Sequence, residues 1–140
     1  MSASSSHSVD VEVRYAETDQ MGVVHHANYI IWFELARTNL CAAIGLHYAD
    51  IERRGYYLLV TGIEAKYRKG ATYGETVQVT AHIERLWSRG IHYTYEVHRD
   101  ATLVATGSSR HVWVDRETGK PTTLPEDLKF GMERLAAGRV

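Results

Sequence analysis

The sequence predicts an α+β domain in which one long helix packs on a mostly antiparallel sheet of about five strands. Three observations point to this class. A helical segment that starts near residue 28 is apolar around most of its circumference, strand-like segments follow it in succession, and turn signals separate them. Successive strands joined by short turns pair antiparallel, and a helix that is apolar nearly all round needs partners on most of its surface.

The first two predicted elements are a strand and the long helix. Residues 9–16 alternate between apolar and polar side chains, with Tyr15 as the last member of the apolar face. From Asn28 the apolar spacing becomes helical, and Gly45 is the expected end of the helix. Ile31 and Leu35 are among the residues that widen its apolar stripe, so we expect the helix to be buried nearly all round.

The remaining predicted elements are a short helical turn, four strands and a closing helix. The helical turn ends at Gly55. The strands are expected at residues 57–68, 76–86, 91–99 and 103–114, and the closing amphipathic helix after residue 123. One sheet around one helix leaves a sheet edge or face uncovered, which predicts an oligomer.

Length and composition limit the function classes. The 140 residues suit one domain, predicted at 9–140 after a disordered polar tail at 1–8. The net charge of −1 gives no sequence-wide reason to expect nucleic-acid binding, and Cys41 is expected to be a small buried side chain. The start lacks the apolar core of a signal peptide and no apolar run is long enough to span a bilayer, so we expect a cytoplasmic protein.

The segment between the first strand and the long helix carries the candidate chemistry. Asp19 lies there, three residues before Gly22. An aspartate in such a loop is commonly a turn residue that accepts hydrogen bonds from nearby backbone amides. The alternative is a carboxylate at the mouth of a cleft, acting as general base or nucleophile. Free N–H groups at the following helix N-terminus are suited to holding an oxyanion, so these residues in this order fit acyl transfer.

Other chemistries have less support. His25 and His26 are adjacent and cannot easily share one ion, and there is no HExxH motif or cysteine/histidine cluster, so no metal site is expected. The sequence also lacks a GxSxG elbow, a Walker loop and a GxGxxG loop. Glu34 and Arg37, three residues apart on the predicted helix, are expected to form an ion pair.

The stretch "ETDQMGVVHHANYIIWFELAR" closely resembles the signature of the hotdog-fold acyl-CoA thioesterases, in particular the branch of 4-hydroxybenzoyl-CoA thioesterase and YbgC. Members of that branch read TD-x-x-G-V-V-x-H-x-N-Y into the long helix. The matching residues here are Thr18, Asp19, Gly22, Val23, Val24, His26, Asn28 and Tyr29. The stretch "AKYRKGATYGETVQV" and the element order from residue 9 to residue 114 also match.

The resemblance implies a hotdog fold, with a curved antiparallel sheet wrapped around a long apolar helix. It also implies homodimers that have active sites at their interface and commonly form tetramers. The implied reaction is hydrolysis of a coenzyme A thioester to the free acid and coenzyme A. Asp19 would be the catalytic carboxylate, as nucleophile or general base, and the backbone N–H of His26 would polarise the thioester carbonyl. No separate cofactor is implied, because coenzyme A is part of the substrate.

The resemblance also assigns substrate contacts. Arg89 is the best positional match for a residue that holds the coenzyme A nucleotide, with Arg68 and Lys69 as weaker candidates. The expected contacts with the acyl group are Leu58, Leu59 and Val60, together with the motif residues Gly22, Val24, His25, Asn28 and Tyr29. His25 stands where an aromatic residue is common, which would make that wall of the pocket more polar.

Two other functions share these features. The hotdog fold also hosts acyl-thioester dehydratases, which pair a histidine with an acid, and a non-catalytic acyl-CoA-binding protein would hold its ligand intact. The complete motif around Asp19 favours the thioesterase. The sequence is compatible with an aromatic or a short aliphatic acyl group, and with a dimer or a tetramer.

Overall fold

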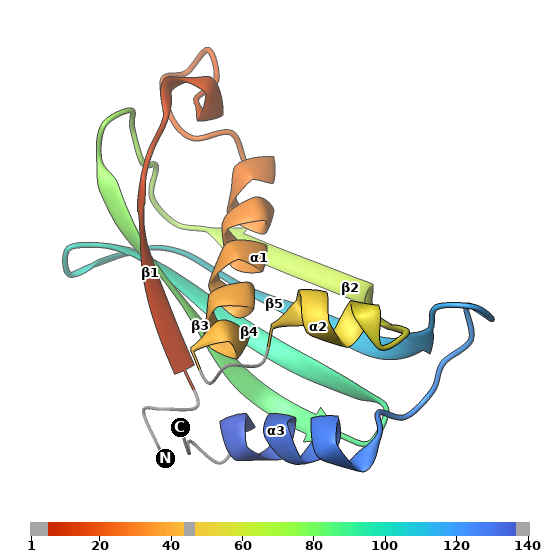
Figure 1. The fold of residues 1–140 in the computed structure, drawn as a ribbon. Helices are drawn as coiled ribbons and strands as arrows, with labels where there is room; N and C mark the ends of the chain where they lie inside the picture. The colour runs from red at the N-terminus through yellow and green to blue at the C-terminus, as the bar shows by residue number, and fades with distance from the viewer. Residues whose placement is uncertain (1–5, 44–46, 137–140) are drawn as a thin grey trace.

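A five-stranded antiparallel sheet curves around one long helix in the computed structural model, which describes residues 6–43 and 47–136 (Figure 1). The strands are β1 (Ser6–Glu12), β2 (Tyr56–Tyr67), β3 (Thr76–Trp87), β4 (Gly90–Arg99) and β5 (Thr102–Asp115). The helices are α1 (Ala27–Ala42), α2 (Tyr48–Arg53) and α3 (Glu126–Ala136), and a 3₁₀ turn spans Tyr15–Glu17. The predicted α+β class is confirmed.

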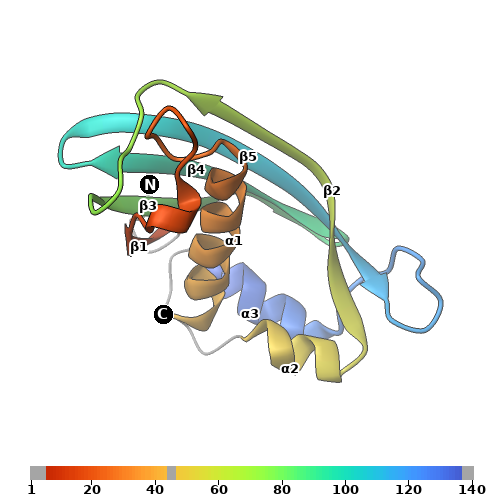
Figure 2. The same cartoon turned by 90° about the horizontal axis from the view of Figure 1, so that it is seen from above.

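The strand order across the sheet is β1-β3-β4-β5-β2, so β1 and β2 form its edges. Strands β3, β4 and β5 are consecutive in sequence and pair as two hairpins, as their alternation and tight turns predict. The edge strands pair with distant segments: Val9 of β1 faces Val79 of β3, and Leu58 of β2 faces Trp113 of β5. Figure 2 shows all three helices on the concave side of the sheet.

The core lies between α1 and the inward faces of the central strands. Phe33 and Ala36 of α1 are fully buried, and the Phe33 ring stacks on Tyr95 of β4 with 4.4 Å between ring centroids. Gly107 of β5 makes room for that ring, because a Cβ atom there would lie 2.3 Å from Cε2 of Phe33. Cys41 is fully buried, as predicted.

Three expectations about element limits and burial are wrong. Residues 6–8, expected in a disordered tail, pair with residues 80–82 of β3, and residues 1–5 lie outside the described residues, as does Gly45. Tyr15 leaves the predicted strand face and is 76% exposed, since the 3₁₀ turn takes the chain out of the sheet after β1. In one chain α1 is buried on one side only, because the sheet covers one side of it: Ile31 is 60% exposed and Leu35 43%.

None of the helices in the described ranges combines the length and apolar character needed to cross a membrane. Within the same ranges, no three histidine, cysteine, aspartate or glutamate side chains are grouped to hold a metal ion.

Candidate active site

The loop that carries Asp19 joins the 3₁₀ turn to α1 and is fixed by backbone hydrogen bonds. The Asp19 N–H donates to the carbonyl of Val23 (2.9 Å), and the Gly22 N–H donates to the carbonyl of Asp19 (3.0 Å). Gly22 has φ +83°, a conformation that favours glycine and explains that residue at this place in the turn. The Val24 N–H donates to the carbonyl of Ala71 (2.9 Å), which anchors the loop to the segment before β3.

The Asp19 carboxylate takes part in a local turn and also lies at a cleft. Its Oδ1 accepts the Met21 N–H at 2.8 Å, which is the local turn role. Its Oδ2 accepts no hydrogen bond from the described part of the chain. The side chain is half-buried at a cleft of about 310 Å³, so one oxygen orients the group while the other is open to a substrate or water.

The cleft is built from the Asp19 loop, the first turn of α1 and the end of β2. Its lining residues are Asp19, Val23, Val24, His26, Tyr29, Tyr67, Arg68, Lys69 and Gly70. Arg68 and Lys69 are exposed there, and their backbone N–H groups both donate to the carbonyl of Val104, which holds the end of β2 in place. A carboxylate, aromatic walls and two cations therefore meet at one opening.

The entry to α1 leaves one backbone donor open. Nδ1 of His25 accepts the Ala27 N–H at 3.2 Å, and the carbonyl of His26 accepts the Tyr67 hydroxyl at 3.1 Å. The His26 N–H, at the N-cap, donates to no acceptor in residues 6–43 or 47–136. The His25 and His26 rings are exposed and stack at 4.1 Å. A free amide at a helix N-terminus is suited to accepting negative charge on an oxygen.

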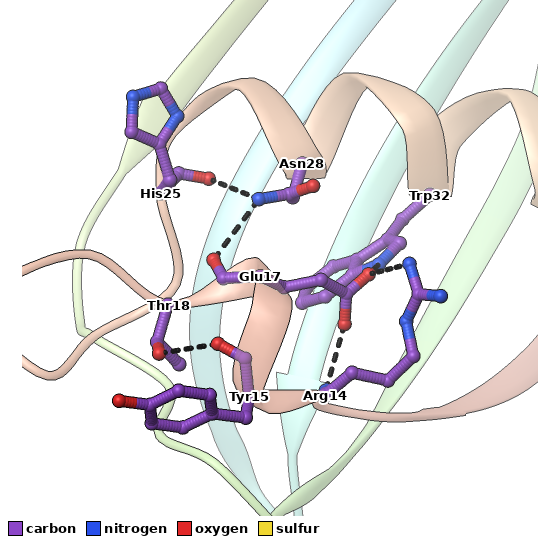
Figure 3. A network of polar contacts seen from close by, with 7 residues as sticks. All are labelled: Arg14, Tyr15, Glu17, Thr18, His25, Asn28 and Trp32. Atoms are coloured by element: carbon purple, nitrogen blue, oxygen red, sulfur yellow. Dashed lines mark hydrogen bonds and ion pairs between the residues drawn. The ribbon is translucent and has the colours of Figure 1, made fainter.

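Glu17, which was not among the predicted site residues, is a buried carboxylate (Figure 3). Its Oε1 accepts the Arg14 backbone N–H at 2.9 Å, and its Oε2 accepts the indole N–H of Trp32 at 3.0 Å. Burial raises the pKa of Glu17, but these hydrogen bonds outweigh burial and leave that pKa below its usual value. The signal in the sequence was an acid three residues after Arg14. The Arg14 N–H donates to the Glu17 carboxylate, and the Glu17 N–H donates to the Arg14 carbonyl, so the two residues close a turn.

Asn28, predicted to contact substrate, makes hydrogen bonds within the protein through its side chain. Its Nδ2 donates to the carbonyl of Glu17 at 3.0 Å and, more weakly, to the carbonyl of His25 at 3.5 Å. It is not among the residues that line the cleft. Gly22, also predicted at the substrate, lines a neighbouring depression that shares Asp19.

Several predicted substrate contacts lie away from this cleft in one chain. Arg89 follows the end of β3, whereas the Asp19 loop is anchored beside the start of that 12-residue strand. Of the three basic residues predicted to hold the nucleotide, Arg68 and Lys69 are the two that line the cleft in a single chain.

The apolar residues predicted for the acyl pocket divide between two faces of β2, because side chains alternate along a strand. Leu58 and Val60 line a second cavity of about 200 Å³ between α1, α2 and β2. Leu59 points the other way and is 51% exposed. Glu34 and Arg37 also line this second cavity and form the predicted ion pair at 3.7 Å.

A family model, two relatives and a solved structure all relate this chain to thioesterases. A family model described as the thioesterase-like superfamily matches residues 13–130. YneP of Bacillus subtilis, a candidate acyl-CoA thioesterase, is 42% identical over 113 residues, which cover 80% of this chain and 82% of that protein. The acyl-CoA thioesterase YbgC of Haemophilus influenzae is 24% identical over 129 residues, 91% of this chain and 95% of that protein. The crystal structure of a DHNA-CoA thioesterase from Staphylococcus aureus superposes with a TM-score of 0.89 at 34% identity, covering 94% of this chain and 91% of that one.

Proposed function

The chain belongs to the thioesterase-like superfamily, and from this premise we propose that it hydrolyses acyl-CoA thioesters with Asp19 as the reacting carboxylate. The names of YbgC and of the Staphylococcus aureus structure support the substrate class. The observation that carries the proposal is geometric. The open oxygen of Asp19 and the segment with the free His26 amide border the same cleft.

The reaction follows from these two groups. Acting as general base, Asp19 takes a proton from water while the water oxygen attacks the thioester carbon; acting as nucleophile, it forms an acyl anhydride that water then cleaves. The carbonyl oxygen becomes an oxyanion that the His26 N–H stabilises. In the general-base route the carbon–sulfur bond of this intermediate then breaks, and the leaving thiolate takes the proton that Asp19 holds. In the nucleophile route the carbon–sulfur bond breaks as the anhydride forms, water then cleaves the anhydride and frees Asp19, and the thiolate takes a proton from that water. Both routes give the free acid and coenzyme A.

Arg68 and Lys69 are the proposed contacts for the coenzyme A phosphates. Both are exposed beside the cleft, and guanidinium and ammonium groups suit phosphate oxygens. Arg89 lies at the far end of β3 and would reach this nucleotide only from another subunit. Coenzyme A enters as part of the substrate, so the proposal includes no separate cofactor.

We further propose that the working form is a dimer built on β2. This edge strand exposes Leu59, Val60 and Ile63, and α1 exposes Ile31 and Leu35. Pairing two β2 strands would satisfy the open edge and cover apolar area. It would also allow the cavity at Leu58 to receive the acyl group from the cleft of the other subunit. Sedimentation of the wild type and of Ile63→Glu tests this proposal, since only the wild type should sediment as a dimer or larger.

Asp19→Asn tests the catalytic proposal directly. The amide oxygen can still accept the Met21 N–H, so the loop should keep its shape, but the group no longer accepts a proton or attacks carbon. We expect kcat for thiol release to fall by about 10²–10⁴-fold across a panel of aromatic and short aliphatic acyl-CoAs. Asp115→Asn is the matched control, because Asp115 also accepts backbone N–H groups in a turn but lies at the end of β5.

Three results would contradict the proposal. Near-normal turnover by Asp19→Asn would remove Asp19 from the chemistry. Enoyl product from 3-hydroxyacyl-CoA substrates would identify a dehydratase. Binding of acyl-CoA without thiol release would identify a non-catalytic binding protein.

A further inference from the structure

We propose that Glu17 is a positioning residue for catalysis. It fixes the position of the Asp19 loop relative to the His26 amide. The inference rests on the proposed function, because it assigns Glu17 an effect on those two groups. It concerns a side chain that is 4% exposed and lies outside the cleft. Glu17 therefore acts without touching substrate.

The contacts of Glu17 join three segments that would otherwise be independent. Its carboxylate binds the backbone N–H of Arg14, where the chain leaves the sheet, and the indole N–H of Trp32 inside α1. The Arg14 guanidinium adds an ion pair at 3.3 Å. The Glu17 carbonyl accepts the N–H of His25 (2.8 Å) and the Asn28 amide (3.0 Å) at the helix entry. Figure 3 shows the contacts of Glu17 with Arg14 at the turn and with Asn28 and Trp32 of α1.

Asp19 and His26, the two proposed catalytic residues, are close in sequence to the residues that make these contacts. Asp19 is two residues after Glu17, and His26 follows the His25 whose N–H is bonded to the Glu17 carbonyl. The rest of the loop is held by hydrogen bonds within itself and by its pairing with the segment at Ala71 and Thr72. Trp32 is 2% exposed in the core, so its bond to Glu17 ties the loop to the buried side of α1.

A residue that only stabilised the fold would make the same contacts as Glu17. The test therefore needs a measurement that a change in stability alone would not alter. Glu17→Gln keeps the size of the side chain and removes the negative charge that accepts donors on both oxygens. If Glu17 positions Asp19 and the His26 amide, kcat should fall about 10²-fold, the loss that small misplacements of reacting groups produce. KM should stay within about threefold, because the lining of the cleft is unchanged.

The decisive measurement is a double-mutant cycle in kcat. Residues that act through one group give non-additive losses, so Glu17→Gln should add little further loss in an Asp19→Asn background. Asp115→Asn serves again as control for the loss of one carboxylate charge, and it should leave kcat unchanged. Trp32→Phe, which removes only the indole donor, should give a smaller kcat loss in the same direction and covers the case in which Glu17→Gln does not fold.

The outcomes separate this inference from the proposed function. If Asp19→Asn is inactive while Glu17→Gln keeps its kcat or multiplies the loss of Asp19→Asn, Glu17 is only structural and the inference is wrong, while the thioesterase proposal stands. If Asp19→Asn remains active, both fail together. A loss of kcat in Glu17→Gln that disappears in the Asp19→Asn background supports positioning.

Discussion

His111 should make folding stability depend on pH below neutrality. It lies on β5 with 1% of its surface exposed, its Nε2 is 2.7 Å from the Ser109 hydroxyl, and its Nδ1 has no hydrogen-bond partner in the described residues. Burial, with smaller contributions from the nearby Arg37 and His92, lowers the pKa of His111 from 6.5 to about 3. The folded protein therefore keeps this ring neutral at pH values where an unfolded chain would protonate it.

The sign and size of the effect follow from proton linkage. Between pH 6.5 and pH 3 the unfolded chain binds a proton at His111 that the folded chain does not, so stability falls as the pH falls through this window. The slope approaches 1.36 kcal/mol per pH unit, which gives a loss of about 2 kcal/mol between pH 7 and pH 5. Over the whole window the loss reaches about 5 kcal/mol.

Denaturant unfolding at pH 7 and pH 5 measures this loss in the wild type and in His111→Phe. Phenylalanine fills a similar volume without a titrating group or an unpartnered nitrogen. We expect the variant to lose about 2 kcal/mol less than the wild type between the two pH values, at one fixed protein concentration because the chain is proposed to dimerise. Losses that agree within about 0.5 kcal/mol would show that His111 titrates freely in the folded state and would refute the reasoning.

Three further predictions concern the cleft and the core. His26→Pro should lower kcat about 10²–10³-fold and His26→Ala far less, because only proline removes the backbone N–H. The φ of −54° at His26 suits the proline ring. Equal kcat values for the two variants would exclude the His26 N–H as oxyanion donor. Replacing Arg68 and Lys69 together by alanine should raise KM about tenfold and weaken its salt dependence, so an unchanged KM would place the phosphates elsewhere. Gly107→Ala should destabilise the fold by about 1–3 kcal/mol, because its Cβ would overlap the Phe33 ring, and an unchanged unfolding temperature would show that the ring shifts freely.

Most of the fold could be predicted because its signals are local. The central strands β3, β4 and β5 alternate cleanly and are joined by short turns, and the structure places their ends within about two residues of the predicted limits. The predicted limits of the first strand, residues 9–16, differ more from β1 at both ends. Ser6 and Ser8 have no strand signal of their own and join the sheet through pairing with His82 and Thr80, a contact that local patterns do not contain.

The candidate site divides in the same way. Asp19 and His26 could be placed together because they belong to one short motif that leads into a helix. Glu17 was missed because its role depends on a contact with Trp32, fifteen residues further along the chain. The Trp32 indole N–H donates to the buried Glu17 carboxylate, and local sequence patterns do not contain this contact. The preference for Arg89 over Arg68 stays a prediction, because sequence position does not show that Arg68 lines the cleft while Arg89 lies at the far end of β3.

The strand order β1-β3-β4-β5-β2 means that both edge strands leave the ribosome before any strand that they pair with. The chain up to residue 67 contains β1, α1 and β2, and its pairing partners begin at Thr76. The hairpins of β3, β4 and β5 can form as they are synthesised, whereas β1 and β2 must close long loops to dock, which is typical of slow-folding topologies. The half of the chain that carries Asp19 therefore has no strand-pairing partners until the other half has been made.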